Sequence, residues 1–393
     1  MIRLSQSPTD PAFVQDPYPF YDRARAAGPV VFWEDYGLPC VFGYAAANQI
    51  LRDRRFGREI PLDRRQPVAT HTAPFYAVEA HSMLELEPPR HTRLRSLVLR
   101  AFTSRRIEAM GPEIEHLARD LIAAFPDEPF DLLGAFAEVI PVVIIARLLG
   151  VPESMKESLL DWSHAMVAMY VAGRTRTVEE AAARASSEFT AFLRDYVDVR
   201  RRRPADDLIT SLIEAEESGE KLSTDELIST CILLLNAGHE ATVHGIGNGV
   251  KALLQHGGPR DWLSPERREA TVEELLRWDP PLHMFTRWAY ERIEVMGHVF
   301  EPGQEVGVML AAAGRDPGVW ENADRFDPGR PVKPHLAFGV GLHFCVGAPL
   351  ARMELLRALP LLFAACPELH LAEPPEYAGR YHFHGLTRLM VAR

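Results

Sequence analysis

The sequence is short of the features that mark several classes of protein. Its 393 residues contain no Ser/Gly linker, low-complexity run or internal repeat, so we expect residues 1–393 to form a single domain. The first 15 residues hold no apolar run near the roughly 20 residues of a membrane-spanning helix, so we expect no membrane anchor. The 54 acidic residues outnumber the 43 basic residues and give a net charge of −11, which argues against a nucleic-acid partner.

Cysteine is also scarce. The chain has four cysteines, Cys40, Cys231, Cys345 and Cys366. They are far apart and form no C-x-x-C pair, which favours a reduced, cytoplasmic location over a disulfide framework. A cysteine cluster and a G-x-G-x-x-G fingerprint are both missing, so we expect no iron–sulfur or flavin module within the chain. A zinc-protease motif is missing too, because His244 follows His239 by five positions instead of four.

What is present is the composition of a globular and mostly helical domain. Hydrophobic residues make up 47% of the chain and charged residues 25%, which allows a sizeable core around a cofactor. Helical periodicity dominates residues 104–276, whereas short β-like runs occupy residues 30–33, 39–42, 287–299 and 304–310. The sequence therefore predicts a mainly α fold with a minor β part, including a small sheet on the N-terminal side.

One helical pattern, at residues 223–255, is unusually long. It begins with a capping box formed by Ser223 and Glu226 and ends before Gly257 and Gly258. At about 1.5 Å per residue it would span roughly 50 Å. We expect this helix to cross the middle of the molecule.

The most informative segment is Phe338-Gly339-Val340-Gly341-Leu342-His343-Phe344-Cys345-Val346-Gly347, which places one cysteine in a glycine-rich loop just before a helical pattern at residues 348–363. The glycines allow tight turns and a close approach to a bulky partner. Backbone amides at the start of the helix would lower the pKa of the thiol and leave it able to bind a metal. We therefore expect Cys345 to be a metal ligand, whereas Cys231 and Cys366, in apolar helical runs, fit buried structural cysteines.

This segment resembles the haem-binding signature of the cytochrome P-450 superfamily, Phe-Gly-x-Gly-x-His-x-Cys-x-Gly, at every specified position. The resemblance runs along most of the chain and implies the cytochrome P-450 fold, with the long helix over the haem. It also implies heme b as the cofactor, with Cys345 as the iron ligand and with Phe338 and Gly339 beside the haem. A thiolate ligand favours O–O cleavage, so the implied chemistry is oxygen activation and not oxygen storage.

The two propionates of haem require cations that donate charge-assisted hydrogen bonds. His91 and Arg95 follow Pro88-Pro89, which begins a helix, and their spacing of four residues puts them on one helix face. Arg287 and His343 match the other cations that the family uses. The resemblance therefore implies that His91, Arg95, Arg287 and His343 bind the propionates.

Within the long helix, Ala237-Gly238-His239-Glu240-Ala241-Thr242 resembles the oxygen-binding motif of the family. The first threonine of that motif, whose hydroxyl helps to deliver protons, is replaced by Ala241. We expect the Thr242 hydroxyl to hydrogen-bond the Gly238 carbonyl. A direct role of this hydroxyl in proton delivery is the less favoured alternative. Glu240 is the remaining candidate for a proton relay, and the alternative is a carboxylate that is merely exposed or paired on the helix. We hypothesise that ordered water or a substrate hydroxyl replaces the missing threonine.

A second family feature is the E-x-x-R pair Glu274-Leu275-Leu276-Arg277 on a helix. By resemblance, Glu274, Arg277 and Arg325 form a structural network behind the cysteine loop and take no part in catalysis. The segment at residues 311–317 resembles another family segment, except that Gly314 stands where Asn is usual.

The resemblance also implies a substrate pocket built from segments that are distant in sequence. Its expected members are Phe75, Met169, His239, Val243, Leu282, Phe285 and Phe383. Most of these side chains are apolar, which suggests an apolar ligand. Ordinary core packing explains each of them about as well, and His239 could equally be a satisfied core histidine.

The implied function is that of a soluble haem-thiolate monooxygenase that uses O₂ and hydroxylates or epoxidises a small to medium-sized apolar molecule. Coupling, desaturation or dealkylation on the same iron stays open as an alternative reaction. A haem-based gas sensor or haem carrier without turnover is an alternative of another class, and the presence of Glu240 on the long helix argues against it. Electrons would come from a ferredoxin or flavodoxin with its reductase. This donor is expected to dock on a basic patch made of Arg93, Arg100, Arg105, Arg106 and Arg352.

Overall fold

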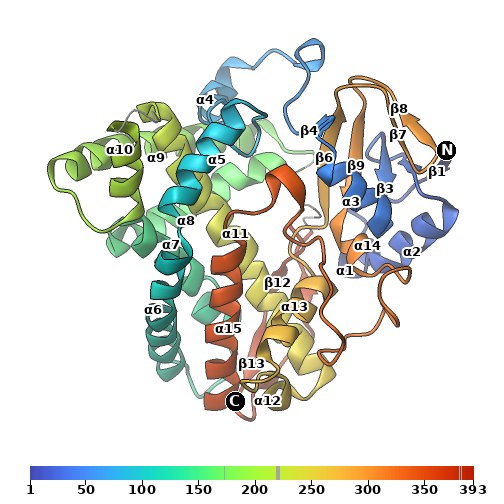
Figure 1. The fold of residues 1–393 in the computed structure, drawn as a ribbon. Coiled ribbons are helices and arrows are strands. Elements are labelled where there is room, and N and C mark those ends of the chain that lie inside the picture. Colours follow the sequence, from blue (N-terminus) through green and yellow to red (C-terminus); the bar gives the residue numbers. More distant parts are fainter. Residues whose placement is uncertain (172, 218–221, 380, 382) are drawn as a thin grey trace.

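Helices make up most of the computed structural model, which describes residues 1–171, 173–217, 222–379, 381 and 383–393 (Figure 1). The helices are α1 (Pro11–Gln15), α2 (Tyr18–Ala27), α3 (Tyr44–Arg52), α4 (Ala73–Glu79), α5 (Arg90–Ala101), α6 (Ser104–Ala123), α7 (Val139–Leu149), α8 (Lys156–Val167), α9 (Arg176–Arg202), α10 (Leu208–Glu217), α11 (Thr224–His256), α12 (Pro259–Trp262), α13 (Arg268–Trp278), α14 (Leu310–Gly314) and α15 (Ala348–Ala365). Single turns are η1 (Leu62–Arg64), η2 (Thr70–Thr72), η3 (Leu133–Ala137), η4 (Glu153–Met155), η5 (Ala168–Tyr170) and η6 (Gly341–His343). The predicted mainly α character is confirmed.

The strands form a minor part of the fold, and the main sheet lies on the N-terminal side. They are β1 (Ile2–Leu4), β2 (Val31–Trp33), β3 (Leu38–Val41), β4 (Phe56–Gly57), β5 (Phe130–Asp131), β6 (Met284–Ala289), β7 (Ile293–Val295), β8 (His298–Phe300), β9 (Glu305–Met309), β10 (His370–Leu371), β11 (Glu376–Tyr377), β12 (Leu386–Arg388) and β13 (Met390–Ala392). The main sheet has the order β1-β2-β3-β9-β6-β4 and lies on the right of Figure 1. Its β1–β2 and β3–β9 pairs are parallel and the other pairs are antiparallel.

The β-like run predicted at residues 287–299 is divided in the structure. Its first part belongs to β6, and the rest forms the β7–β8 hairpin. The hairpin turns at Met296 and Gly297, whose φ angles are 51° and 82°. Two consecutive residues with positive φ match the twist of the flanking strands and allow this tight reversal.

Helix α11 crosses the middle of the molecule, as the sequence predicted (Figure 1). The capping box is present: Ser223 Oγ accepts from the Glu226 amide at 3.2 Å, and a Glu226 carboxylate oxygen accepts from the Ser223 amide at 2.9 Å. The helix packs against α7, α8, α9 and α13, which together bury most of its length. Its middle is therefore held rigidly inside the helical part of the fold.

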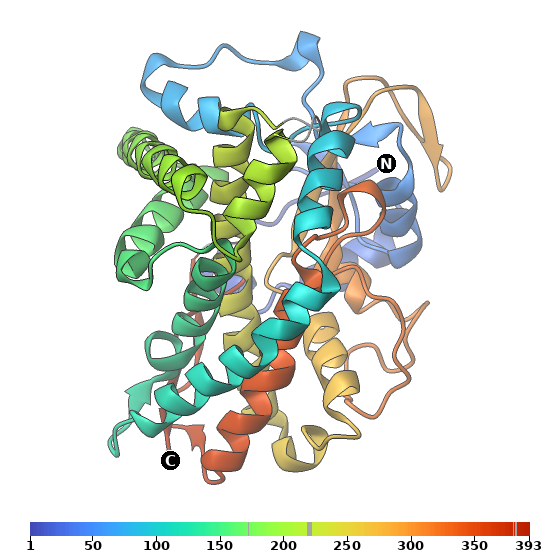
Figure 2. The same cartoon turned by 60° about the vertical axis from the view of Figure 1, so that its left-hand side comes forward.

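Helix α15 also lies in the helical part, where it packs along α6 and contacts α11 and α13 (Figures 1 and 2). The largest hydrophobic cluster fills the space between these helices, and smaller clusters cover the two faces of the main sheet. Among the described residues, none of the helices combines the length and apolar character needed to cross a membrane. The loop at residues 338–347 leads into α15, so the cysteine segment is anchored at one end by the helical core.

Candidate active site

The glycine-rich loop before α15 has the tight geometry that its sequence predicts. Gly339 and Gly341 adopt φ angles of 65° and 79°, which a residue with a side chain rarely adopts. A Cβ on Gly341 would also lie 2.5 Å from the carbonyl oxygen of Leu51. The amide of Cys345 donates to the carbonyl of Phe338 at 3.0 Å and closes the loop. Cys345 is thereby held two residues before Gly347, the residue that precedes the first turn of α15.

Cys345 differs from the other cysteines in its surroundings. Cys40, Cys231 and Cys366 are buried, whereas Cys345 is exposed. Protein packed around its sulfur nevertheless desolvates the thiolate. This burial raises the pKa of Cys345 above its ordinary value, and the amides at the start of α15, with Arg95 and Arg352, oppose the rise only in part. The expected fall in pKa is therefore wrong in net direction for the free thiol. Coordination to a metal deprotonates a thiol outright, which fits Cys345 as a ligand.

Cations expected at the propionates gather beside this loop. The rings of His91 and His343 are 4.3 Å apart. Arg95, one helical turn after His91 on α5, donates to the carbonyl of Phe344 at 2.7 Å. The side chains of His91 and Arg95 thus join the start of α5 to the cysteine loop.

Two of these basic groups are buried without an anionic partner among the described residues. Arg287, 2% exposed on β6, donates to the carbonyl of Thr286 at 2.7 Å and faces no carboxylate at ion-pair distance. Burial and the nearby charge of Arg58 lower its pKa to about 9. Burial also lowers the pKa of His91 to about 4, and its Nδ1 has no hydrogen-bond partner. Such unpaired groups suit an anionic partner, so the residues present fit haem propionates.

The structure adds two residues to this cluster that the sequence did not indicate. Arg58, just after β4, forms an ion pair with Glu85 and lies close enough to Arg287 to affect its pKa. Glu87 accepts from His343 Nε2 at 2.8 Å and from the Arg58 amide at 2.7 Å. Both residues lie in irregular segments, where no periodic pattern marks a functional side chain.

On α11, small residues line an uncovered face of an otherwise buried helix. Ala237 is exposed, and Ala241 and Gly245, at steps of four residues, are partly exposed. Positions four residues apart lie on the same helix face. This face lacks bulky side chains at these positions, which suits the close approach of a flat group or a small molecule.

Glu240 projects from the same part of α11 and is surrounded by histidines. It is 4% exposed, and its carboxylate lies 3.5 Å from His164 Nε2, 3.8 Å from His239 Nδ1 and 3.6 Å from His244 Nε2. Burial acts to raise the pKa of Glu240, but the three histidines outweigh it and lower the pKa to about 2. The group is therefore an ionised carboxylate in contact with imidazoles that can carry protons.

Thr242 does not behave as expected. It is buried on α11, but its hydroxyl makes no hydrogen bond to the Gly238 carbonyl in the part of the chain that the structure describes. Elsewhere a hydroxyl does bond to the preceding helical turn: Ser186 Oγ donates to the Ala182 carbonyl at 2.8 Å. The expectation for Thr242 is therefore wrong.

The residues expected in the substrate pocket fall into separate groups. Phe75 on α4 contacts the ring of Tyr170, next to Met169 in η5. Leu282 pairs with Phe383 as an isolated β-bridge, and the Phe383 ring lies 6.2 Å from that of His244. Val243 and His239 are buried on α11.

Phe285, another expected pocket residue, lies with the cations. The guanidinium carbons of Arg58 and Arg287 are each 5.8 Å from the centre of its ring. A Cβ added to Gly339 would be 3.5 Å from the same ring, so Phe285 borders the cysteine loop.

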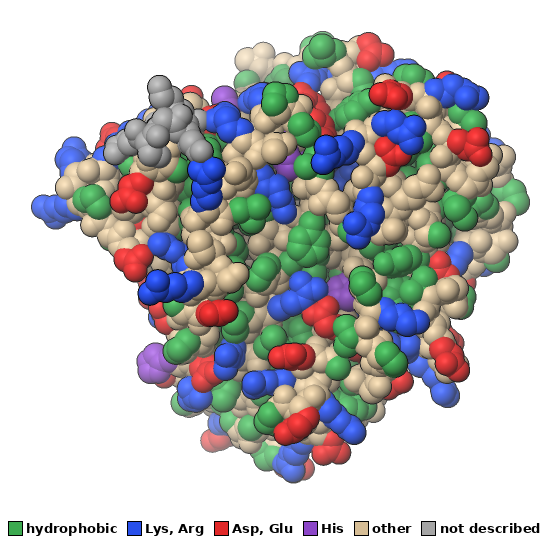
Figure 3. All heavy atoms as spheres, in the orientation of Figure 1, with side chains coloured by type: hydrophobic (Ala, Val, Ile, Leu, Met, Phe, Trp, Pro, Cys, Tyr) green, Lys and Arg blue, Asp and Glu red, His purple; other side chains and the backbone are tan. Residues whose placement is uncertain are grey.

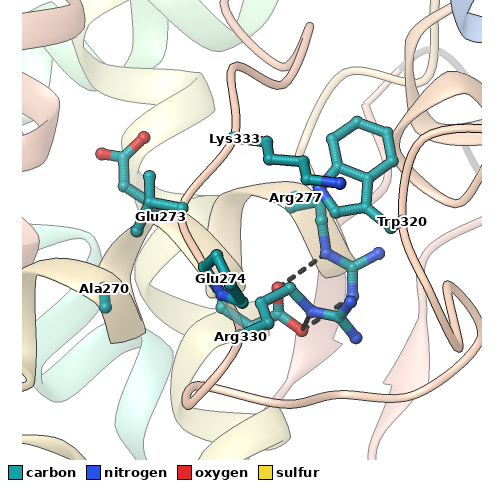
Figure 4. A pocket seen from close by; sticks show the side chains of 9 residues that line it. Ala270, Glu273, Glu274, Arg277, Trp320, Arg330 and Lys333 are labelled. Carbon is teal, nitrogen blue, oxygen red and sulfur yellow. Dashed lines mark hydrogen bonds and ion pairs between the residues drawn. The ribbon is translucent and has the colours of Figure 1, made fainter.

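The E-x-x-R pair is the centre of a buried ion network (Figure 4). Arg277 donates to both carboxylate oxygens of Glu274, at 2.6 and 2.7 Å. The second guanidinium is that of Arg330, whose Nε donates to Glu274 at 3.0 Å, and not that of Arg325. Arg325 is exposed and contributes its carbonyl, which accepts from Arg277 at 3.0 Å and from Arg330 at 2.9 Å. The expectation for the Arg325 side chain is therefore corrected to Arg330.

Gly314, where the family usually has Asn, closes against this network. Its carbonyl accepts from Arg277 Nη1 at 2.9 Å. A Cβ at this position would lie 2.7 Å from the Arg277 carbonyl oxygen. In this chain the glycine therefore allows α13 and α14 to approach closely.

A neighbouring carboxylate, Glu273, ties the same helix to the cysteine segment. It accepts from Arg352 on α15 at 2.5 and 3.0 Å and contacts His335 Nε2 at 3.1 Å. The Arg352 guanidinium lies 4.6 Å from the centre of the Phe338 ring. The sequence did not indicate Glu273, although it directly precedes Glu274.

The expected docking patch carries less free positive charge than the sequence suggests. Arg352 is paired with Glu273, Arg93 with Glu226, and Arg106 with Asp206. Arg100 and Arg105 are exposed. Basic and acidic side chains are interspersed over this face of the molecule (Figure 3).

Known proteins resemble this chain along most of its length. The family model described as Cytochrome P450 matches residues 268–367. Cytochrome P450 monooxygenase PikC from Streptomyces venezuelae is 38% identical over 379 residues, covering 92% of this chain and 87% of that protein. Polyketide biosynthesis cytochrome P450 PksS from Bacillus subtilis is 34% identical, covering 100% of this chain and 99% of that protein. A crystal structure of P450BioI in complex with acyl carrier protein ligated to hexadec-9Z-enoic acid has a TM-score of 0.91 at 34% identity, covering 97% of this chain and 99% of that one.

Replacing Arg330 with Ala should destabilise the protein by about 1–3 kcal/mol, because the buried Glu274 loses one of its two guanidinium partners. Arg325→Ala removes an exposed side chain, keeps the carbonyl and should stay within about 0.5 kcal/mol of the wild type. Urea unfolding of both variants measures the difference. Equal losses of stability in the two variants, or a larger loss in Arg325→Ala, would contradict the assignment of Arg330 to the network.

Proposed function

This chain belongs to the cytochrome P450 family and is a haem-dependent monooxygenase, and we propose that it hydroxylates or epoxidises a small to medium-sized apolar organic molecule. We take heme b to be the form of the cofactor. The observation that carries the proposal is the surroundings of Cys345. This exposed cysteine sits in a tight glycine loop beside buried basic groups that have no anionic partner in the described part of the chain.

Haem bound through Cys345 would supply oxygen activation, because a thiolate ligand favours O–O cleavage. The loop amides and Arg95 would stabilise the thiolate from the protein side. His91, Arg95, Arg287 and His343 would hold the propionates. The small residues of α11, with Ala237 and Ala241 among them, would leave room for oxygen and substrate on the side of the site away from Cys345.

Protons would reach the site through the histidines and Glu240. With a pKa of about 2, the carboxylate is ionised at neutral pH, so it would hold a proton only transiently while the proton moves between its neighbours. The His164 side chain is 48% exposed, so it can exchange protons with solvent and lies 3.5 Å from Glu240. Ala241 offers no hydroxyl, so water or a substrate hydroxyl would complete the path.

The substrate class is proposed from the relatives together with the apolar groups near α11. PksS is named for polyketide biosynthesis, and the P450BioI structure holds a fatty acyl chain on a carrier protein. The side chains of Tyr170, Leu282 and Phe383 are partly exposed and would provide apolar surface that suits such a chain. We therefore favour an acyl or polyketide-derived substrate.

Electrons would come from a ferredoxin or flavodoxin with its reductase, because the sequence has no flavin or iron–sulfur motif of its own. Arg93, Arg100 and Arg105 are the exposed residues of the expected patch, on α5 and α6, where an acidic partner would meet them. The cysteine usage is consistent with a cytoplasmic location.

The substrate proposal predicts a low-spin to high-spin shift when fatty-acyl or polyketide compounds are titrated into the purified ferric protein. An apolar ligand that displaces water from the site causes this shift, which absorption spectroscopy measures. With a ferredoxin and its reductase, the binding compound should gain one oxygen atom, detected by mass spectrometry. A shift given only by small, strongly polar compounds would contradict the apolar substrate class.

Glu240→Gln should slow product formation by about 10- to 100-fold and divert electrons into hydrogen peroxide, because the amide cannot relay a proton. Glu108→Gln, which changes an exposed glutamate on α6, is the matched control. Product and peroxide are measured against consumed NADPH. Unchanged rate and coupling in Glu240→Gln would remove this residue from the proton path.

A further inference from the structure

A cluster of histidine and glutamate side chains lies between α8 and α11, beside the proposed proton path. It consists of His164 on α8 with His239 and Glu240 on α11. One donor atom from each residue lies within 4.8 Å of the other two. Two imidazoles and one carboxylate are the ligand types that first-row transition metals take in proteins.

The distances suit a single small ion. The carboxylate of Glu240 is 3.5 Å from His164 Nε2 and 3.8 Å from His239 Nδ1. Ligands at about 2.1 Å from a tetrahedral ion are separated by about 3.4 Å. Small side-chain rotations therefore bring the three donors to coordination distance, with a fourth position left for water.

The unpartnered ring nitrogens of His239 indicate that this cluster binds a ligand. Its side chain is 3% exposed, and neither ring nitrogen has a hydrogen-bond partner among the residues that the structure describes. A buried polar group without a partner costs free energy, which a bound ion at Nδ1 would recover for that nitrogen. His244, 3.6 Å from the other carboxylate oxygen, would orient Glu240 from behind.

A second cluster of the same residue types shows the contrast. In Asp279, His283 and His384, His384 Nδ1 contacts Asp279 at 3.0 Å and Tyr21 Oη contacts His283 Nδ1 at 2.8 Å, whereas His283 Nε2 lies 3.8 Å from Asp279 without a hydrogen bond. All three residues are buried. The α8–α11 cluster differs in having an accessible side, because the side chain of His164 is 48% exposed.

We propose that His164, His239 and Glu240 form a binding site for a divalent first-row transition-metal ion, separate from the haem site. The ion binds one unprotonated nitrogen of each imidazole and takes the carboxylate as its third ligand. One consequence rests on the proposed function: an ion at Glu240 removes that carboxylate from proton transfer and slows turnover.

Zn²⁺ is the probe, titrated calorimetrically into the haem-loaded full chain. We expect one Zn²⁺ per chain at this site and a loss of affinity of about tenfold or more in His164→Ala and in His239→Gln. His164 is half exposed, so its variant tests the site even where the buried His239→Gln fails to fold. His116→Ala is the matched control, because it removes an exposed histidine that lies 3.3 Å from Asp120 on α6. Wild-type Zn²⁺ affinity and stoichiometry in His164→Ala would overturn the proposal.

Turnover in the presence of Zn²⁺ separates the two proposals. Inhibition that is present in the wild type and in His116→Ala, but lost in His164→Ala, supports both the metal site and the role of Glu240. Zn²⁺ binding at the site with unchanged turnover supports the site and contradicts that role. Absence of Zn²⁺ binding overturns the metal site and leaves the monooxygenase function untouched.

Discussion

Two adjacent carboxylates on α13 hold the structure around the cysteine loop. Glu274 is buried between Arg277 and Arg330, and it also accepts from the Asp327 amide at 2.8 Å. Glu273 faces the other way and binds Arg352 and His335. A buried charge is tolerated only when it is paired and hydrogen-bonded, so the network fixes the irregular segment at residues 322–338 in one path. That path leads directly into the loop that presents Cys345.

The opposite side of the site is built on a different principle. Helix α11 is held by packing on most of its length, and its small residues leave one face uncovered. Among the described residues, His91 Nδ1 and both ring nitrogens of His239 lack a hydrogen-bond partner, and the Arg287 guanidinium has no carboxylate at ion-pair distance. Local departures from full hydrogen bonding are expected at functional sites, because a ligand completes them.

The sequence predicted those features that depend on local pattern. The cysteine loop, the capping box of Ser223 and Glu226 and the long helix follow from residue type and spacing. Which guanidinium reaches Glu274 depends on the path of an irregular segment, so the sequence pointed to Arg325 where the structure has Arg330. Spacing also placed Thr242 correctly on α11 but could not show where its hydroxyl points. The raised pKa of Cys345 reflects desolvation of its sulfur by the folded protein around it, which the local motif does not show.

The carbon-monoxide difference spectrum of the reduced protein, compared between Cys345→Ser and Cys366→Ser, tests the central claim most directly. Cys366 is buried at the end of α15 and is a control of the same residue type. The account predicts that the wild type and Cys366→Ser show the spectrum of thiolate-ligated haem and that Cys345→Ser loses it. A thiolate spectrum retained in Cys345→Ser would mean that another residue binds the iron and that the site is wrongly placed.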